Sequence, residues 1–334
     1  MTPTLECFPV AIPTCNRVGH LRNCVESLSR CTHADKTELV IGVDYPPSEK
    51  YEEGWLRLKE YVRTISGFGK VTVFVHEKNL GAIENSKMVC DYCLTNYAAC
   101  IFSEDDNVFS PCFLDYMDKA LVTYFDSERI VSVSGFCHAA SRCDDKCRAF
   151  LSYDSNAWGF GLWRHKEQAH TAAFASEAQK SVECPAKAVK VLLRYPALLR
   201  MLVAMADKRT QWGDVMRTAY NIQSNHFQLR PALSLVRNCG YDGTGIHCGS
   251  KDDRLLHQQA ISDEKTFDFG VEQPRLETKG LFVQEMRETN SKFKYVRDTF
   301  RRYKKFWKRL HPGQSFYLAL LKSVVSMDKE LANK

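Results

Sequence analysis

The sequence predicts an α/β fold in which helices flank a mixed, mostly parallel sheet, with a helical C-terminal extension. Three observations predict it: short apolar runs alternate with segments of helical periodicity, polar clusters follow the apolar runs, and one run ends in three consecutive acids. Alternation of strand and helix favours a parallel sheet, in which ligands bind beyond the carboxyl ends of the strands. We therefore expect a ligand site where the polar clusters meet.

The predicted elements follow one another in order from the N-terminus. The strands are residues 9–12, 39–43, 71–75 and 100–102, and the helices are 21–29, a segment through Lys87, Val89 and Leu94, and 113–121. In the first helix, Leu21, Cys24, Val25 and Leu28 recur at the spacing of one helical face. That face is expected to be buried in the domain.

Three acids, Glu104, Asp105 and Asp106, end the fourth predicted strand. Adjacent carboxylates repel one another unless they hold a hard cation, and Mg²⁺ and Mn²⁺ prefer oxygen ligands. A solvated acidic turn is the alternative interpretation. Polar residues at the ends of the other strands favour the interpretation as a metal site. They are Thr14, Asn16 and Arg17 after the first strand, Asp44 after the second, and Asn79 and Gly81 after the third.

Two segments of the N-terminal region resemble known enzymes. Residues 9–17 (PVAIPTCNR) and 79–85 (NLGAIEN) look like the opening of family 2 glycosyltransferases, which transfer sugars from nucleotide-sugars. This resemblance implies the GT-A (Rossmann-like) fold.

Three further motifs resemble the N-acetylglucosaminyltransferase I type of the same fold. The acids at 104–106 match its E-D-D metal motif, and residues 158–163 (WGFGLW) are similar to its acceptor-side segment. Residues 211–217 (QWGDVMR), followed by 229–231 (LRP), are similar to the run that carries its catalytic base. Together the five motifs cover roughly residues 8 to 250.

The resemblance implies a role for each motif. Asp106 would be the direct ligand of Mn²⁺ or Mg²⁺, with Glu104 and Asp105 supporting the metal or reaching the ribose. Uridine or another base would be recognised by Thr14, Asn16, Arg17 and Asp44, and the nucleotide-sugar would also contact Asn79, Gly81 and Asn85. The acceptor or sugar would contact Trp158, Gly161 and Trp163. His247 would contact the diphosphate or metal. A place in the core for the tryptophans, and a structural role for His247, are the alternatives.

Asp214 is the candidate general base, because the acceptor hydroxyl must lose its proton on the face of the sugar opposite the leaving group. Gly213 stands where the similar enzymes have a first acid, so Asp214 has no second carboxylate beside it. One carboxylate and no covalent nucleophile imply a single displacement, and hence inversion. Alternatively, Asp214 is an acid at a helix N-terminus, where the helix dipole favours negative charge.

We expect one catalytic domain with two attachments. Residues 1–250 would form the catalytic domain, with a nucleotide-binding half at about 1–110 and an acceptor half at about 111–250, and residues 251–334 would form a C-terminal extension. Residues 182–209 are an apolar and basic insertion that Pro196 should break into two helices. These helices would either pack in the core or lie as an interfacial hairpin near the acceptor site.

The C-terminal extension contains a predicted basic amphipathic helix. Val296, Phe300, Tyr303, Trp307 and Leu310 recur at the spacing of one helical face, and lysines and arginines fill the rest. Residues 287–309 hold ten Lys/Arg and two acids, so the remaining chain has a net charge of −2 within a total of +6. Such a helix suits an anionic membrane surface. The alternative is a helix packed on the domain with a solvated basic face.

Composition narrows the class of protein. The length of 334 residues and the hydrophobic content of 44% fit a globular enzyme, and the charge outside the tail argues against nucleic acid as a partner. No signal peptide or membrane span is recognised, so we expect reduced thiols and a cytoplasmic protein, peripheral on the inner face of the cell membrane.

Most of the 14 cysteines are expected to be small core residues, including Cys7, Cys24, Cys90, Cys93 and Cys100. A half zinc site is the alternative for a later group, namely Cys143 and Cys147 with Cys137 and His138. Structural zinc ligands more often occur as paired C-x-x-C units, which disfavours that alternative.

The sequence therefore predicts a metal-dependent, inverting hexosyltransferase. The resemblance implies that it moves a sugar from a nucleotide-sugar, with a UDP-sugar expected, to a glycan or lipid-linked acceptor in bacterial surface polysaccharide synthesis. A nucleotidyltransferase of similar fold is one alternative, although residues 13–17 lack the glycine-rich loop that would bind a triphosphate. A non-catalytic sugar- or membrane-binding relative is the other, and Gly213 is the feature that favours it.

Overall fold

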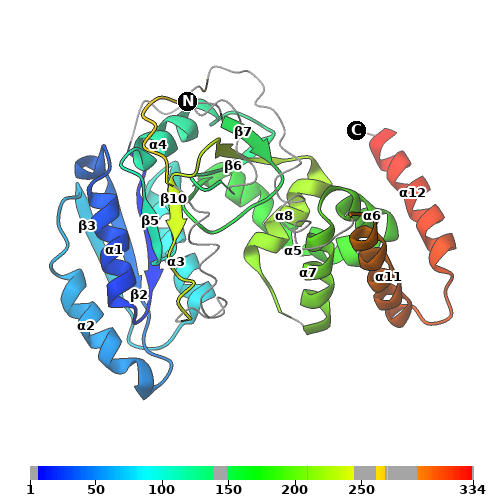
Figure 1. Cartoon of the computed structure of the whole chain (residues 1–334), viewed down its shortest axis with the longest axis horizontal. Helices are drawn as coiled ribbons and strands as arrows, with labels where there is room; N and C mark the ends of the chain where they lie inside the picture. The colour runs from blue at the N-terminus through cyan, green and yellow to red at the C-terminus, as the bar shows by residue number, and fades with distance from the viewer. Residues whose placement is uncertain are drawn as a thin grey trace. The chain divides into compact units, whose positions relative to one another are not determined.

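The computed structural model describes residues 7–137, 149–208, 210–243, 261–267, 269 and 292–332. The chain divides into two compact units, and Figure 1 labels their helices and strands. The first unit is Met1–Leu151, Asn156–Glu167 and Gln228–Leu276, and the second is Ser152–Ser155, Gln168–Phe227 and Glu277–Lys334.

An eight-stranded mixed sheet has the order β3-β2-β1-β4-β8-β6-β9-β7. Its strands are β1 (Val10–Thr14), β2 (Glu38–Val43), β3 (Lys70–Val75), β4 (Ala99–Phe102), β6 (Ile130–Ser134), β7 (Ala149–Ser152), β8 (Phe160–Trp163) and β9 (Phe227–Pro231). The first four run parallel, and β8 runs antiparallel to β4 and β6. The predicted fold class, a mixed and mostly parallel sheet with flanking helices, is confirmed, as are the four predicted strands.

Helices cover the parallel strands. The helical elements of the first unit are α1 (Val18–Ser29), η1 (Ala34–Lys36), η2 (Glu49–Tyr51), α2 (Glu52–Val62), α3 (Ala82–Asn96) and α4 (Phe113–Thr123), and α5 (Arg164–Glu183) begins in it. α1 buries the predicted face of Leu21, Cys24, Val25 and Leu28. α3 packs on β1, β2 and β4, where it buries Val89 and Cys93 against alternate residues of the strands. Every residue of β2 is buried, as expected for a parallel strand covered on both faces.

A small second sheet lies next to the acidic motif in sequence. β5 (Asn107–Phe109) pairs antiparallel with β10 (Val236–Asn238), and Asn107 is opposite Asn238. The sequence did not predict this pair, because strands of three residues are too short to show a period. The pairing brings a distant part of the chain to Asp106.

The second unit is helical. It contains most of α5 and all of α6 (Pro185–Arg194), α7 (Pro196–Lys208), α8 (Gly213–Ser224), α11 (Lys292–Leu310) and α12 (Phe316–Ala332). Pro196 begins α7, so the predicted break of the insertion into two helices is confirmed. α11 packs on α7 and α6, and α12 packs on α6 (Figure 1).

Residues 168–227, which we expected to lie in the acceptor half of the catalytic domain, group with the C-terminal helices in the second unit. The physical reason is the burial of two aromatic side chains of α11 within this unit. Tyr303 and Trp307 are 1% and 2% exposed, the Tyr303 hydroxyl donates to the carbonyl of Val182 at 3.1 Å, and the Trp307 indole donates to that of Glu183 at 2.9 Å.

The aromatic stripe of α11 therefore packs inside the second unit, as the alternative interpretation of the tail held. Its aromatic face is not available for insertion into a membrane, which corrects that part of our expectation. Within the described residues, no helix combines the length and the apolar character that crossing a bilayer requires.

Candidate functional site

The acids after β4 lie beside the residues that follow β1. Asp105 and Asp106 are 4% and 6% exposed. The hydroxyl of Thr14 donates to Asp105 Oδ2 at 2.7 Å, and the Arg17 guanidinium forms ion pairs with Asp105 and, at 2.9 Å, with Asp106 Oδ2. β1 and β4 are adjacent parallel strands, so their carboxyl ends lie at one edge of the sheet. The structure thus brings together four of the predicted site residues.

The charges at this edge depend on one another. Burial raises the pKa of the Asp105 carboxyl above its usual value, and the neighbouring Asp106 raises it further, although Arg17 lowers it. Burial alone would lower the pKa of Arg17, but the two carboxylates raise it, so the guanidinium stays charged. One fixed positive charge faces two buried carboxyl groups, and the edge is well suited to a further cation.

Asn238 is a member of this cluster that the sequence did not reveal. Its amide donates to Asp106 Oδ1 at 2.7 Å and to Asn107 Oδ1 at 3.2 Å, and Asn238 is only 1% exposed. The backbone N–H of Cys239 also donates to the carbonyl of Asp106 at 2.7 Å. A Cβ at Gly240 would lie 2.2 Å from Asp106 Oδ2, so only glycine leaves room for that carboxylate. The available signal was Gly240 two residues after a polar Asn, which is weak by itself.

Asp44 organises the loop that follows β3. Its carboxylate accepts hydrogen bonds from the backbone N–H groups of Tyr45 at 2.9 Å and of Leu80 and Gly81 at 2.8 Å, and from the Asn79 amide at 3.1 Å. Gly81 has a φ of +82°, which side-chain-bearing residues rarely adopt. Asp44, Asn79 and Gly81 are therefore brought together as predicted. Asp44 is 4% exposed, and its carboxylate is engaged with the protein itself.

Asn85 has a structural role. Its amide N–H₂ donates to the carbonyls of Gly42 at 2.9 Å and Thr14 at 3.3 Å, and its Oδ1 lies 3.1 Å from His76 Nε2. A Cβ at Gly42 would lie 2.3 Å from this Oδ1, so α3 and β2 approach closely at this point. Asn85 is 2% exposed and joins α3 to the sheet, and its expected contact with the nucleotide-sugar stays a prediction.

The three predicted acceptor residues of the WGFGLW segment, Trp158, Gly161 and Trp163, lie in different surroundings. Trp163 is fully buried, its indole N–H donates to the carbonyl of Leu121 at 2.8 Å, and the Lys166 ammonium lies 3.6 Å from the ring centroid. A Cβ at Gly161 would lie 2.9 Å from the side chain of Leu121 on α4. Trp163 and Gly161 thus serve the packing of α4 on β8, and their expected contact with the acceptor stays a prediction.

Trp158 is half-buried and remains a candidate for contact with a sugar. Its ring packs edge-on against Phe136, with ring centroids 4.6 Å apart, and its centroid lies 6.2 Å from that of Tyr241. Asn16 and Glu104 are also half-buried. A Cβ at Gly54 would lie 2.5 Å from the carbonyl oxygen of Asn16, so the turn after β1 approaches α2 closely.

Asp214 belongs to the second unit, where it lies in the first turn of α8. Its side chain is exposed, and its Oδ1 accepts a 2.8 Å hydrogen bond from the backbone N–H of Val215. This is the geometry of an acid at a helix N-terminus, and it leaves the predicted catalytic role untested. His247 lies outside the described residues, as do His138, Cys143 and Cys147 of the alternative zinc site.

Comparison with known proteins gives structural likenesses at low identity. No protein-family model and no curated protein matches the chain. One similar solved structure is S. aureus TarS 1-349, with 14% identity, 49% of each chain covered and a TM-score of 0.34. A second is mannosyltransferase PcManGT from Pyrobaculum calidifontis in complex with GDP-Man and Mn²⁺, with 12% identity, 98% of this chain and 76% of that chain covered, and a TM-score of 0.37. A third is mouse xyloside xylosyltransferase 1, with 10% identity, 76% of this chain and 94% of that chain covered, and a TM-score of 0.37.

The likeness to TarS spans about half the length of the TarS 1-349 chain. All three TM-scores are below 0.5, where similarity does not establish a common fold or function.

Proposed function

We propose that the chain is a metal-dependent, inverting glycosyltransferase that takes a sugar from a nucleotide-sugar, with a UDP-sugar as the expected donor. One observation carries the proposal: Thr14, Arg17, Asp105 and Asp106 meet at the carboxyl ends of two adjacent parallel strands. That edge is where open α/β sheets bind ligands. Its charged groups suit a nucleoside diphosphate, which carries negative charge and is usually bound together with a divalent cation.

The residues present fit Mn²⁺ or Mg²⁺ as the cofactor. Asp106 would hold the cation, supported by Glu104 and Asp105, since carboxylate oxygens are the donors that these ions prefer. Arg17 is paired with Asp106 Oδ2, so it would move aside or share that oxygen. Asn238, bonded to the other oxygen, would hold the carboxylate in a fixed orientation. The bound cation would stabilise negative charge on the diphosphate leaving group.

Residues of the chain itself would bind the donor and remove the proton from the acceptor. Arg17 stays charged next to the acids and supplies a second positive charge for the diphosphate. Thr14, Asn16 and the loop held by Asp44 would bind the nucleoside. Asp214 would remove the proton from the acceptor hydroxyl, and His247 is a further proposed contact with the diphosphate or metal. A single base without a covalent nucleophile is consistent with a single displacement and inversion.

The proposed acceptor is a glycan or lipid-linked saccharide of bacterial surface polysaccharide synthesis, and the proposed further partner is an anionic membrane surface. Support comes from two features of the second unit. α11 exposes basic side chains, and α12 exposes an apolar stripe that is not buried in the unit. The basic residues are Arg301, Arg302, Lys305, Lys308 and Arg309, and the stripe is Tyr317, Leu318, Leu321, Val324 and Val325.

Hydrolysis of nucleotide-sugars in the absence of acceptor tests the proposal. A panel of UDP-, GDP- and other nucleotide-sugars is incubated with the full chain, with Mn²⁺ or with chelator, and nucleoside diphosphate release is measured. We expect Mn²⁺-dependent release from one donor class, and loss of release and of donor binding in D106N. D91N is the matched control, because Asp91 is an exposed acid on α3.

Two results would contradict the proposal. Donor binding that is equal in the wild type and D106N, and equal with Mn²⁺ and with chelator, would exclude a metal site at Asp106. Release of pyrophosphate from a nucleoside triphosphate, without any turnover of nucleotide-sugars, would indicate a nucleotidyltransferase instead.

A further inference from the structure

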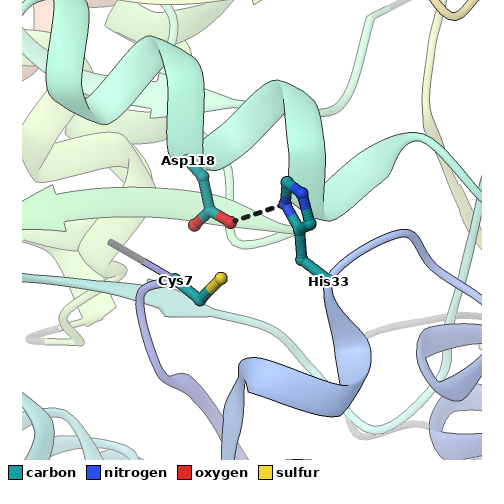
Figure 2. A group of neighbouring side chains, drawn as sticks. All are labelled: Cys7, His33 and Asp118. Carbon is teal, nitrogen blue, oxygen red and sulfur yellow. Dashed lines mark ion pairs between the residues drawn. The ribbon is translucent and has the colours of Figure 1, made fainter. Parts of the chain in front are cut away.

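A second group of metal-ligating side chains lies away from the acids. Cys7, His33 and Asp118 each offer one ligand atom, and these atoms all lie within 4.8 Å of one another (Figure 2). Cys7 precedes β1, His33 precedes η1, and Asp118 is on α4. Because Cys7 lies before the amino end of β1 and Thr14 ends that strand, the two sites are at opposite ends of β1.

The hydrogen bonding within this group is incomplete. Asp118 is 1% exposed, and its Oδ1 accepts a 3.1 Å hydrogen bond from the backbone N–H of Phe8. Its Oδ2 and the Nδ1 of His33 are buried atoms without a hydrogen-bond partner among the described residues. Buried polar atoms are normally satisfied, so two such atoms facing each other need an explanation.

The distances fit ligands of one ion better than a hydrogen-bonded pair. His33 Nδ1 and Asp118 Oδ2 are 3.7 Å apart, which is too long for a hydrogen bond. Tetrahedral zinc with its usual bond lengths holds neighbouring N, O and S ligand atoms roughly 3.4–3.6 Å apart. A small inward movement of Cys7 Sγ would complete that spacing. Figure 2 shows the imidazole, the carboxylate and the thiol converging from three separate segments.

The backbone holds His33 in place. His33 has a φ of +74°, an uncommon conformation for a residue with a side chain. Its carbonyl accepts hydrogen bonds from the Lys36 N–H at 3.0 Å and the Thr37 hydroxyl at 2.9 Å. This strained but secured turn directs the imidazole toward Asp118. Strained backbone that the surroundings maintain occurs frequently at ligand sites.

We propose that Cys7, His33 and Asp118 bind a thiophilic divalent cation of the Zn²⁺ type. A thiolate, an imidazole and a carboxylate are the ligand types of zinc sites, and the thiol selects against the hard cations expected at Asp106. His33 and Cys7 are partly exposed, so solvent can supply a fourth ligand. The ion would neutralise the thiolate and the buried carboxylate, and it would fasten the segment before β1 to α4. The Cys7 thiol loses its proton when the ion binds.

Cobalt substitution of the full chain tests the site, because a cysteine ligand gives Co²⁺ a thiolate charge-transfer band that an all-oxygen site does not give. The protein is stripped of metal under a phosphine reductant and titrated with Co²⁺, and then with Zn²⁺ in competition. We expect one equivalent with the thiolate band in the wild type, in D106N, and in the control C184S, whose cysteine is also partly exposed.

C7S should lose the thiolate band, and H33N should bind Co²⁺ at least about 10-fold more weakly than the wild type does. Asparagine tolerates a positive φ, so H33N keeps the turn. Zn²⁺ should raise the thermal unfolding temperature of the wild type and not of C7S. No band in the wild type, a band that persists in C7S, or an unchanged Co²⁺ affinity in H33N would overturn the assignment. Loss of Mn²⁺-dependent donor hydrolysis in D106N with the cobalt band intact would separate the two metal sites.

Discussion

The amide of Asn238 is 2.7 Å from the carboxylate of Asp106, although the two residues are 132 positions apart in sequence. Asn238→Ala would leave Asp106 Oδ1 without this donor while the ion pair with Arg17 remains. Removing a buried hydrogen bond to a charged group costs about 1.5–3 kcal/mol. We expect that loss in the free energy of unfolding, measured with urea.

The same variant should weaken the Mn²⁺ dependence of donor hydrolysis. Partners that orient a metal ligand typically contribute about 10–100-fold to metal affinity. N96A is the control, because Asn96 is exposed and its amide donates to a backbone carbonyl on α3, so its effect should stay within about 0.5 kcal/mol. A fully stable N238A would show that the bond contributes nothing.

Glu38 makes the free energy of unfolding of the first unit depend on pH in the acid range. Burial would raise the pKa of its carboxyl, but hydrogen bonds from Thr72, Tyr97 and Lys70 outweigh burial and lower the pKa to about 2. The unfolded chain therefore binds more protons than the folded chain between about pH 4.5 and pH 2. Glu38 stabilises the fold fully above that range and loses its contribution as the pH falls through it.

E38Q should remove this part of the acid sensitivity. We expect the wild type to be more stable than E38Q at pH 7, and the difference to shrink by about 3 kcal/mol between pH 5 and pH 2. Urea unfolding at a series of pH values measures it. E60Q, which changes an exposed glutamate of α2, is the control. A difference between wild type and E38Q that does not vary with pH would contradict the prediction.

The parallel half of the sheet could be predicted because its signals are local. Residues 39–43 form an apolar run bounded by polar residues, and β2 spans Glu38–Val43. Thr14, Arg17 and Asp105 could be placed together because residues at the carboxyl ends of parallel strands share one edge. The strand order itself was not needed for that inference.

What the sequence could not show depends on packing between distant segments. Asn238 joins Asp106 through the pairing of two three-residue strands, for which no local period exists. Trp163 looked like a sugar-stacking residue by resemblance, whereas its surroundings, set by α4, make it a core residue. Likewise, the burial of Tyr303 depends on helices that lie more than 100 residues earlier in the chain.

The two tryptophans of the 158–163 segment should respond differently to truncation. Trp163→Ala removes a fully buried side chain, and such changes cost about 3–5 kcal/mol. Trp158→Ala removes a half-buried ring and should cost less, while raising KM for the acceptor if the ring contacts the sugar. Chemical unfolding and acceptor kinetics measure the two effects. A W158A enzyme with unchanged acceptor KM would assign Trp158 to packing as well.

Asp214→Asn separates catalysis from helix capping. If Asp214 is the general base, turnover should fall roughly 10²-fold or more at saturating acceptor while donor affinity is kept. If it acts only at the N-terminus of α8, the variant should lose about 0.3–1 kcal/mol of stability with near-normal turnover. D207N is the control, since Asp207 is an exposed acid on α7 of the same unit. Near-normal turnover of D214N would exclude Asp214 as the base.

The exposed surface of the two C-terminal helices should bind anionic membranes. Tyr317, Leu318 and Leu321 are 59%, 56% and 66% exposed, and they lie with Val324 and Val325 on one face of α12. The Lys304 ammonium lies 4.1 Å from the centroid of the Tyr317 ring, so the basic helix α11 borders this stripe. Each Lys or Arg near an anionic surface contributes about 1 kcal/mol, and inserted apolar side chains add to that.

Sedimentation with vesicles measures the binding, and point variants are preferable to truncation because removing α11 would also remove the buried Tyr303 and Trp307. We expect the full chain to sediment with anionic vesicles at low salt and less at high salt, since exposed charges are screened. Two triple variants should reduce binding to the vesicles, one by removing apolar side chains and the other by reversing basic charges. They are L318S/L321S/V325S on the stripe and R301E/K305E/K308E on the basic face.

Matched controls lie in the first unit, where L56S changes an exposed leucine and K50E/K59E reverses two basic charges of the η2–α2 segment. These controls should bind as the wild type does. Equal sedimentation of wild type and both triple variants, or equal binding to neutral and anionic vesicles, would show that this surface is not a membrane contact. Loss in the basic-face variant alone would leave an electrostatic contact, with the apolar stripe of α12 outside the bilayer.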